Sequence, residues 1–379
     1  MVVSKRCQTI FKELEAFYTF KDTVEPVFHL GVDYVRKTVG EKVRYEMGSF
    51  TYVKGAIERI TALIEESGHE VPVKSSAPLE ENYQPELDES TPLEGPDHTL
   101  YMQLVGTYLW IVALGRVDIA FAVSSMSRFS AIPREGHLEH LFGVFAYLSN
   151  FPDRRIPVDA RPMDESIGRK MKGARESMLK MYPDAFEEID DSHPEPRGED
   201  LETSIWFDAN NAHDQLSRRS ISGIIAFLGR TMIKGYSRRQ TSIASSTYTS
   251  ELHAGRTASE EAMSLRYLLR SLGIRISRPT ILLGDNEGSL KNTCEANSAL
   301  KKRHVGISYH VSRECQAAGI TERRHVSSQE NRADMCTKAL SSSSILAQCQ
   351  NGIFCNMPQG NKKQRRMAAR RRASQTCNL

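Results

Sequence analysis

The segment 247–272 places the strongest constraint on the fold of this chain. It contains no proline and is followed by Gly273, a residue type that commonly ends helices. Its small and apolar residues recur in steps of three and four, which predicts an amphipathic helix with one buried face. The predicted face comprises Ala254, Ala258, Ala262, Leu265, Leu269 and Leu272. Counting back three residues from Ala254 gives Glu251, so the same face carries a carboxylate near the start of the helix.

An unpaired buried carboxylate costs several kcal/mol, so Glu251 should have a cation, a proton or a metal ion beside it. Two further acids are in a similar position. Asp285 follows the short apolar run TILLG (280–284), which is typical of a buried strand, and Asp208 ends the strand-like run SIWF (204–207). Strand-end acids that converge with an acid of a helix would form an oxygen-rich site suited to Mg²⁺ or Mn²⁺.

Asp334 is a fourth candidate. It lies in the first turn of a predicted helix after Asn331, where the helix dipole favours an acid even without a metal. The alternative for all four acids is that they are ordinary surface residues or helix caps. Each acid stands in its own short motif, and these motifs are WFDAN (206–210), STYTSEL (246–252), LGDNE (283–287) and ADMCTK (333–338).

Other ordered motifs lie between and around these acids. They are SRRQTSIASST (237–247), LRYLLRSLG (265–273), RH (303–304), YH (309–310) and RE (313–314). Taken together over residues 201–340, the series resembles the ribonuclease H domain of Ty1/copia-type retrotransposon polyproteins. The resemblance implies an α/β fold in which a ribonuclease H-like mixed sheet is flanked by helices. The expected element order is β-β-β-α-β-α-α-β-α, with 221–228 and 231–237 forming a hairpin.

The resemblance also implies an activity, which is hydrolysis of the RNA strand of an RNA–DNA hybrid with two Mg²⁺ (or Mn²⁺) ions. It assigns metal binding and catalysis to Asp208, Glu251, Asp285 and Asp334, with Asp208 bridging the ions. His304 is a further candidate for catalysis, because a histidine near such a site can shuttle protons or help product release. The alternative for His304 is packing beside a basic helix or contact with a phosphate.

Six basic residues and one glutamine are the predicted nucleic-acid contacts. They are Arg238, Arg239, Gln240, Lys301, Lys302, Arg303 and Arg313. The first three precede the long helix and are expected at the minor groove of the hybrid, where 2′-hydroxyls distinguish RNA. The last four form a cluster expected to contact backbone phosphates. Residues 201–340 hold 20 Lys/Arg against 13 Asp/Glu although the whole chain has a formal charge of only +3. This segregation is the pattern of a protein that binds a polyanion.

The upstream half continues the resemblance. The segments YMQLVGT (101–107) and RVDIAFAV (116–123) resemble the region between polymerase and ribonuclease H, and HLGVD (29–33) resembles a strand that follows the polymerase palm. A smaller, partial α+β thumb/connection module is therefore expected before the nuclease. The Tyr-x-Asp-Asp turn of a polymerase is absent, so the chain is expected to begin after it and polymerase activity is not expected. The rest of a retrotransposon polymerase is a candidate partner.

The predicted organisation has six parts. They are a remnant following the palm (1–71), an acidic Pro-rich linker (72–98), a helical thumb/connection (99–152), a charged linker or insertion (153–200), the ribonuclease H domain (201–340) and a basic disordered tail (341–379). Both linkers are expected to be exposed and flexible. The tail has seven basic residues and no acids, which fits a nuclear localisation or nucleic-acid patch, or translated read-through.

Composition limits the cellular setting. The seven cysteines form no Cys-x-x-Cys pair, which favours free thiols in a reducing compartment. No apolar run approaches about 18 residues and no signal-peptide pattern is present, so no membrane association is expected. The expected location is cytoplasmic, in a virus-like particle, or nuclear, and not secreted.

Three motifs depart from the family pattern: the segment 246–251 has one residue more than the family's, a family tryptophan is missing before Ser237, and the first acid motif is changed. The family sequence D-x-D-W-A-G is replaced by DANNAH (208–213), which lacks the second acid and the tryptophan. No predicted catalytic acid is lost by this change. The competing hypothesis is a catalytically inactive retroelement remnant that only binds nucleic acid, and a third is a pseudogene product whose upstream half folds poorly.

Overall fold

The computed structural model describes residue 12 and residues 27–40, 42–73, 75–173, 175–298, 305–350 and 352–355. Its centre is a six-stranded mixed sheet with the order β5-β10-β9-β6-β7-β8. In chain order the strands are β5 (Arg169–Lys170), β6 (Thr203–Asn210), β7 (Ile221–Leu228), β8 (Thr231–Arg239), β9 (Thr280–Gly284) and β10 (Thr321–His325). Strands β6, β7 and β8 are antiparallel neighbours, whereas β9 runs parallel to both β6 and β10.

This arrangement is the ribonuclease H-like mixed sheet implied by the resemblance. Helix α7 (Thr247–Ser271) follows β8, and α8 (Glu287–Cys294) and α9 (Gly306–Ala317) follow β9. A 3-10 helix, η4 (Arg332–Cys336), follows β10, and α10 (Ser342–Gln350) comes after it. The predicted order of elements is confirmed, except that the last predicted helix of the series is a 3-10 helix.

Alternation along the strands gives the sheet two buried faces. On β6, Ile205 and Phe207 pack against the alanines of α7, whereas Trp206 faces the opposite side, where η4 and α10 pack. Both faces are buried because helices cover each of them, which explains why all residues of β6 except the last are buried.

Helix α7 matches its predicted range closely, but its predicted stripe is wrong at one end. The alanines and Leu269 are buried as expected, whereas Leu272 is 67% exposed. Arg266 is buried instead, because its guanidinium forms an ion pair with Glu187 (Nε to Oε1, 2.6 Å).

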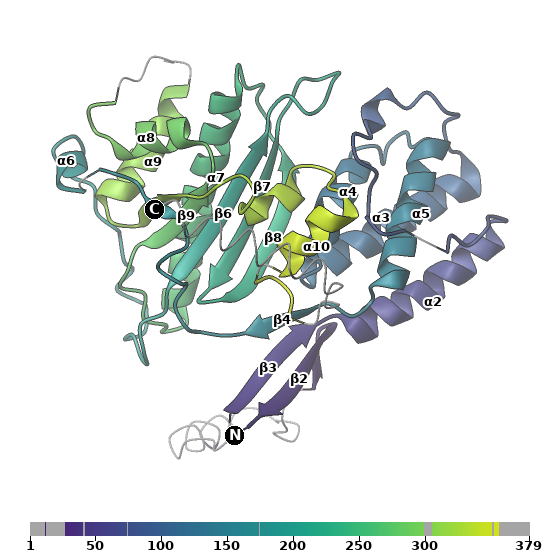
Figure 1. Ribbon diagram of the computed structural model, residues 1–379, viewed down its shortest axis with the longest axis horizontal. Coiled ribbons are helices and arrows are strands. Elements are labelled where there is room, and N and C mark those ends of the chain that lie inside the picture. Colours follow the sequence, from purple (N-terminus) through teal and green to yellow (C-terminus); the bar gives the residue numbers. More distant parts are fainter. Residues whose placement is uncertain are drawn as a thin grey trace, which may run out of the picture.

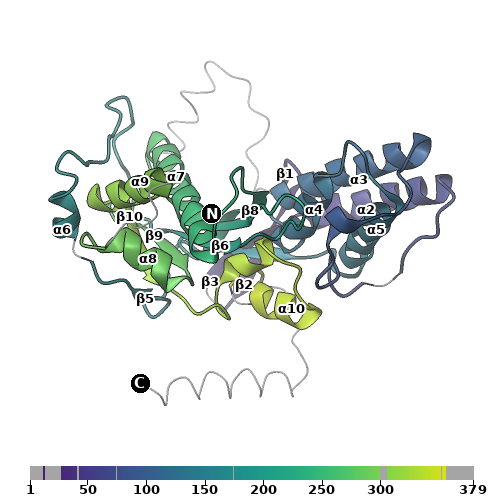
Figure 2. The same ribbon diagram turned by 90° about the horizontal axis from the view of Figure 1, so that it is seen from above.

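A helical group lies beside the sheet, formed by α2 (Phe50–Glu66), α3 (Gly95–Ala113), α4 (Ala120–Ser127) and α5 (Glu135–Asn150). Below it is a four-stranded antiparallel sheet of β1 (Phe28–His29), β2 (Val32–Val39), β3 (Lys42–Gly48) and β4 (Arg155–Val158). The shorter elements are two 3-10 helices, η1 (Pro85–Leu87) and η2 (Val117–Ile119), and the five-residue helix α6 (Arg175–Leu179). Figures 1 and 2 show α4 on the side of the helical group that faces β8.

The helical group and the large sheet share their cores. Val117 and Ala120 pack in the same cluster as Trp206, and a Cβ on Gly235 would lie 2.5 Å from Val117. Within the segment that contains Val117, Arg116 and Asp118 form a buried ion pair, with Arg116 Nη2 2.8 Å from Asp118 Oδ2.

Three segments predicted as linkers or tail are packed instead of exposed. In 72–98, Leu79 and Leu93 are buried in the core of the helical group. In 153–200, β4 pairs with β3 of the four-stranded sheet, and β5 pairs with β10 of the six-stranded sheet. In 341–379, α10 packs on η4, and Ile353 and Phe354 are buried beside Trp206. These segments have polar average compositions, but a few apolar residues in each are enough to anchor them. The remainder of the tail, 356–379, lies outside the described residues.

Candidate metal centre and nucleic-acid cleft

Three carboxylates from three different elements converge at one end of the sheet. Asp208 is on β6, Glu251 is in the first turns of α7, and Asp285 follows β9. Each offers an oxygen atom that lies within 4.8 Å of the others. The register explains the meeting of the two aspartates, because the parallel pairs 204↔281, 205↔282 and 206↔283, continued by two residues, bring Asp208 beside Asp285.

Glu251 reaches the cluster because the start of α7 is fixed. The Ser246 hydroxyl caps the helix by accepting a hydrogen bond from Thr249 N at 3.3 Å. The first turns of α7 therefore hold Glu251 on the buried face, as the periodicity predicted, and its side chain is 4% exposed.

Asp334 lies beside this trio but is bound differently. It is in η4, which Asn331 caps by accepting from Ala333 N at 3.2 Å. One Asp334 oxygen, Oδ2, is 2.8 Å from Lys338 Nζ, and its other oxygen is buried without a hydrogen-bond donor among the described residues. Asp208 is held from the same segment, because the Thr337 hydroxyl donates to Oδ2 of Asp208.

The electrostatics of the cluster are unfavourable without a cation. Burial, followed by repulsion from Asp334, raises the pKa of Asp208 to about 7. Burial and the charges of Asp208 and Asp285 raise the pKa of Glu251 well above its ordinary value. Burial also raises the pKa of Asp334, although the Lys338 ammonium opposes this effect. Within the described structure, Glu251 Oε2 has no hydrogen-bond partner, so the trio has oxygen atoms available for a divalent cation.

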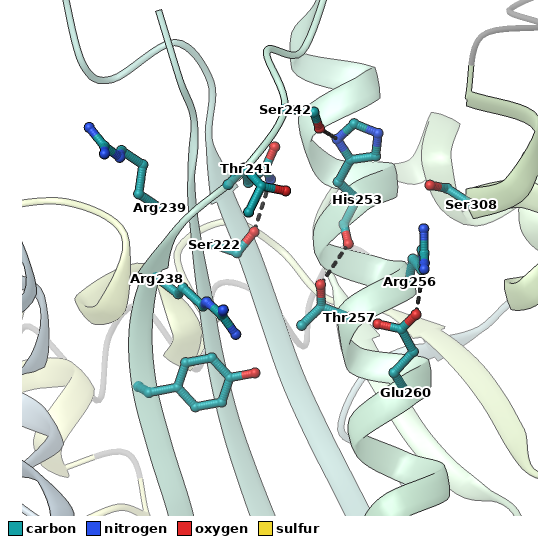
Figure 3. A pocket seen from close by; sticks show the side chains of 12 residues that line it. Ser222, Arg238, Arg239, Thr241, Ser242, His253, Arg256, Thr257, Glu260 and Ser308 are labelled. Carbon is teal, nitrogen blue, oxygen red and sulfur yellow. Dashed lines mark hydrogen bonds and ion pairs between the residues drawn. The ribbon is translucent and has the colours of Figure 1, made fainter. Parts of the chain in front are cut away.

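A basic cleft of about 330 Å³ opens along α7, the helix that carries Glu251 (Figure 3). It lies between the end of β8 and the first half of α7. Arg238 is exposed here and Arg256 pairs with Glu260 across one turn of α7 (Nε to Oε1, 2.8 Å). The Gln240 amide is turned inward, donating to Ser222 Oγ and to Ser250 O, each at 2.9 Å.

The other predicted basic contacts have different outcomes. Arg239 lines the same cleft, and its Nη1 lies 3.4 Å from an oxygen of Asp214. The prediction that Arg313 contacts nucleic-acid phosphates is wrong. Its guanidinium is fully buried and donates to the backbone carbonyls of Asn292, Glu295 and Ser298. Arg313 therefore anchors the end of α8 and the segment that follows it. Lys301, Lys302, Arg303 and His304 lie outside the described residues.

Two residues of the site were not assigned a role from the sequence. Thr337 and Lys338 were recognised only as part of a motif, yet Thr337 binds Asp208 and Lys338 binds Asp334. The available signal was their spacing of three and four residues from Asp334, which places them one helical turn away.

Comparisons with known proteins agree with the motifs. The chain is 28% identical over 245 residues to the "Retrovirus-related Pol polyprotein from transposon RE1" of Arabidopsis thaliana, covering 65% of this chain and 14% of that protein. It is 24% identical over 240 residues to the corresponding polyprotein from transposon TNT 1-94 of Nicotiana tabacum, covering 63% and 15%. A shorter match, 38% identical over 79 residues, is to the "Putative transposon Ty5-1 protein YCL074W" of Saccharomyces cerevisiae, covering 21% and 23%.

Among solved structures, ribonuclease H1 of Halobacterium salinarum is matched with a TM-score of 0.28 and 15% identity, covering 36% of this chain and 94% of that one. No family model matches the chain. Among the described residues, every helix is too short or too polar to cross a membrane. The chain spans about 14% of the length of the polyproteins RE1 and RE2. Across 65% of its own length, the chain is a homologue of retrovirus-related Pol polyproteins of Ty1/copia-type transposons.

Proposed function

We propose that this chain hydrolyses the RNA strand of RNA–DNA hybrids in a metal-dependent reaction, as the ribonuclease H part of a retrotransposon Pol polyprotein. The observation that supports this most strongly is the convergence of Asp208, Glu251 and Asp285 within 4.8 Å. Two buried carboxylates and a half-buried one, from separate elements, repel one another, so their arrangement is costly unless a cation binds between them.

The donor set fits Mg²⁺ or Mn²⁺, because all three residues offer hard oxygen ligands. Asp208, Glu251 and Asp285 would hold the ions, and the free oxygen of Asp334 would complete the site. Divalent cations in such sites lower the pKa of bound water and stabilise the charge of the leaving oxygen. Thr337 contributes by fixing the orientation of the Asp208 carboxylate.

The basic cleft would bind the substrate next to these acids. Arg238 is exposed at its edge and can meet a phosphate, while Gln240 lies at its base close to Glu251. Because phosphate contacts are electrostatic, binding should weaken steeply as salt concentration rises.

A second candidate function is binding of hybrid nucleic acid without cleavage. The excess of 20 basic over 13 acidic residues in 201–340 supports it, because that charge attracts nucleic acid with or without catalysis. The Lys338–Asp334 ion pair also supports it, because the ammonium already neutralises part of the acid cluster.

One experiment separates these functions. The purified chain is incubated with a labelled RNA–DNA hybrid, a DNA duplex or an RNA duplex, in Mg²⁺, Mn²⁺ or EDTA. We expect cleavage of the RNA strand of the hybrid that requires metal and is lost in Asp208→Asn. The matched control is Asp190→Asn, which removes an exposed acid distant from the cluster. A folded protein that binds the hybrid but leaves it uncut in both metals would support the binding-only function.

A further inference from the structure

A second cleft, of about 570 Å³, lies on another side of the acid cluster. Its walls are segment 82–84, the β6–β7 loop at 210–218, and Lys338 with its neighbour Ala339. Two of its residues belong to the surroundings of the acids, because Asn210 is two residues beyond Asp208 on β6 and Lys338 binds Asp334. The cleft is therefore continuous in structure with the proposed nuclease site.

The wall formed by 82–84 comes from the segment predicted to be a flexible linker. Several contacts fix it in place. Glu86 Oε1 accepts a hydrogen bond from Gln215 N at 2.6 Å, and the Gln84 amide donates to His213 O at 3.3 Å. On its other side, the Tyr83 ring stacks on His140 with centroids 3.5 Å apart. The upstream module thus holds this wall rigidly against the loop that follows Asp208.

The backbone is strained around this cleft. Of the described residues other than glycine, four have a positive φ, and three of these line the cleft: Asn82 (φ 63), Ala212 (φ 49) and Arg218 (φ 55). A residue with a Cβ adopts this conformation only at an energetic cost, and such residues concentrate at functional sites.

The chemistry of the lining selects an anionic, hydroxyl-bearing ligand. The described residues that line the cleft include two cations, Arg218 and Lys338, and no carboxylate. The side-chain amide of Asn82 adds hydrogen-bond donors and an acceptor, whereas the Asn210 amide nitrogen already donates to His213 Nδ1 at 3.1 Å and to Thr337 O at 3.2 Å. The nearest buried acid of the loop, Asp214, is already neutralised, because its Oδ2 lies 3.1 Å from Arg128 Nη1 and 3.4 Å from Arg239 Nη1.

We propose that this cleft is a binding site for the ribose-phosphate backbone of the RNA strand, built jointly by segment 82–84 and the β6–β7 loop. Arg218 and Lys338 would meet a phosphate, and the amide of Asn82 would recognise a 2′-hydroxyl. The identity of the strand rests on the proposed nuclease function, whereas the role of segment 82–84 rests on the cleft itself. The nuclease site is thus completed by a segment about 120 residues upstream of Asp208.

The test measures binding in EDTA, so that no strand is cut. Fluorescence anisotropy gives the affinity of the full chain for an RNA–DNA hybrid and for a DNA duplex of the same sequence. Asn82→Gly tolerates the positive φ and removes the side chain with its amide, so it should fold normally. We expect it to weaken hybrid binding about 3- to 10-fold while leaving DNA-duplex binding unchanged.

Arg218→Gln should weaken binding to both duplexes and lower the slope of log affinity against log salt by about 1. The charge-matched control is Arg278→Gln, an exposed arginine before β9 whose loss should change neither quantity beyond a small uniform effect. Single RNA residues of the hybrid are replaced by deoxynucleotides, one at a time. At one position this replacement should weaken binding to the wild-type chain but not to Asn82→Gly.

The outcomes separate this proposal from the nuclease proposal. If the wild-type chain cuts hybrids but both variants bind like Arg278→Gln, with unchanged melting temperatures, the cleft proposal is overturned and the nuclease function stands. If the chain cuts nothing yet Asn82→Gly selectively loses hybrid affinity, the cleft proposal stands and the nuclease function fails.

Discussion

The acid cluster should make the metal-free protein less stable as pH rises, and Asp208→Asn should remove that penalty. A carboxyl group whose pKa is raised in the folded state favours the protonated form. Its effect on stability is absent below the unfolded pKa of 3.8, grows as pH rises, and is complete above the folded pKa of about 7. The interval between these pKa values corresponds to roughly 4 kcal/mol, at about 1.36 kcal/mol per pKa unit.

The expected effect can be read as a difference between two pH values. With those pKa values, the penalty from Asp208 is roughly 2 kcal/mol at pH 5 and roughly 4 kcal/mol at pH 8. The stability of Asp208→Asn relative to the wild type should therefore increase by roughly 2–3 kcal/mol between these conditions. Urea unfolding in EDTA, followed by circular dichroism at both pH values, measures this difference directly.

Metal should narrow the stability difference between the two proteins at pH 8. A ligand present at about 100 times its Kd stabilises the folded state by roughly 2.7 kcal/mol, so Mg²⁺ should stabilise the wild type and not Asp208→Asn. Asp190→Asn serves as the control and should follow the wild type in every condition. If Asp208→Asn and the wild type differ in stability by the same amount at pH 5 and pH 8 in EDTA, the claim that the folded structure forces like charges together is refuted.

Three further predictions concern stability and ion binding. Glu187→Gln should lower the unfolding free energy at pH 7 by about 1–3 kcal/mol, as measured by urea unfolding. The reason is that hydrogen bonds from two arginines outweigh the effect of burial and lower the pKa of Glu187 to about 2. The loss of stability should therefore shrink as pH falls from about 4.5 towards 2. Asp118→Ala should lower the unfolding free energy by about 3–5 kcal/mol because it leaves the buried Arg116 unpaired. The control Asp164→Ala, at an exposed position, should change it little. Similar melting temperatures of the two variants would contradict the role of the Arg116–Asp118 pair. Lys338→Gln should tighten Mg²⁺ binding several-fold in calorimetry because a competing cation is removed, and weaker binding would indicate that the ammonium supports the site instead.

Local pattern was sufficient for the part of the site carried by regular elements. The step of three and four residues located α7, and the same count placed Glu251 on its buried face. The apolar run before Asp285 gave β9 with its observed bounds. In both cases the relevant information lies within a few residues of the acid, so one sequence window contains it.

Contacts over long sequence distances could not be obtained in this way. Segment 72–98 has the polar composition of a linker, yet Leu79 and Leu93 anchor it in the core. Arg266 was not expected on the buried face of α7, because its partner Glu187 lies 79 positions earlier in the chain. Average composition describes how a segment interacts with water, but not which distant residue neutralises one of its charges.

The buried position of α10 and of Phe354 has a consequence for the order of events during synthesis. Trp206 and the sheet face around it are made early, but the residues that cover them follow almost 150 positions later. At about 5–20 residues per second, the ribosome takes roughly 7–30 s to supply that cover. During this interval the nascent sheet exposes a large apolar face, so the growing chain should depend on chaperones that shield it. Asp334 also emerges late, which means that an incomplete chain cannot assemble the full acid cluster.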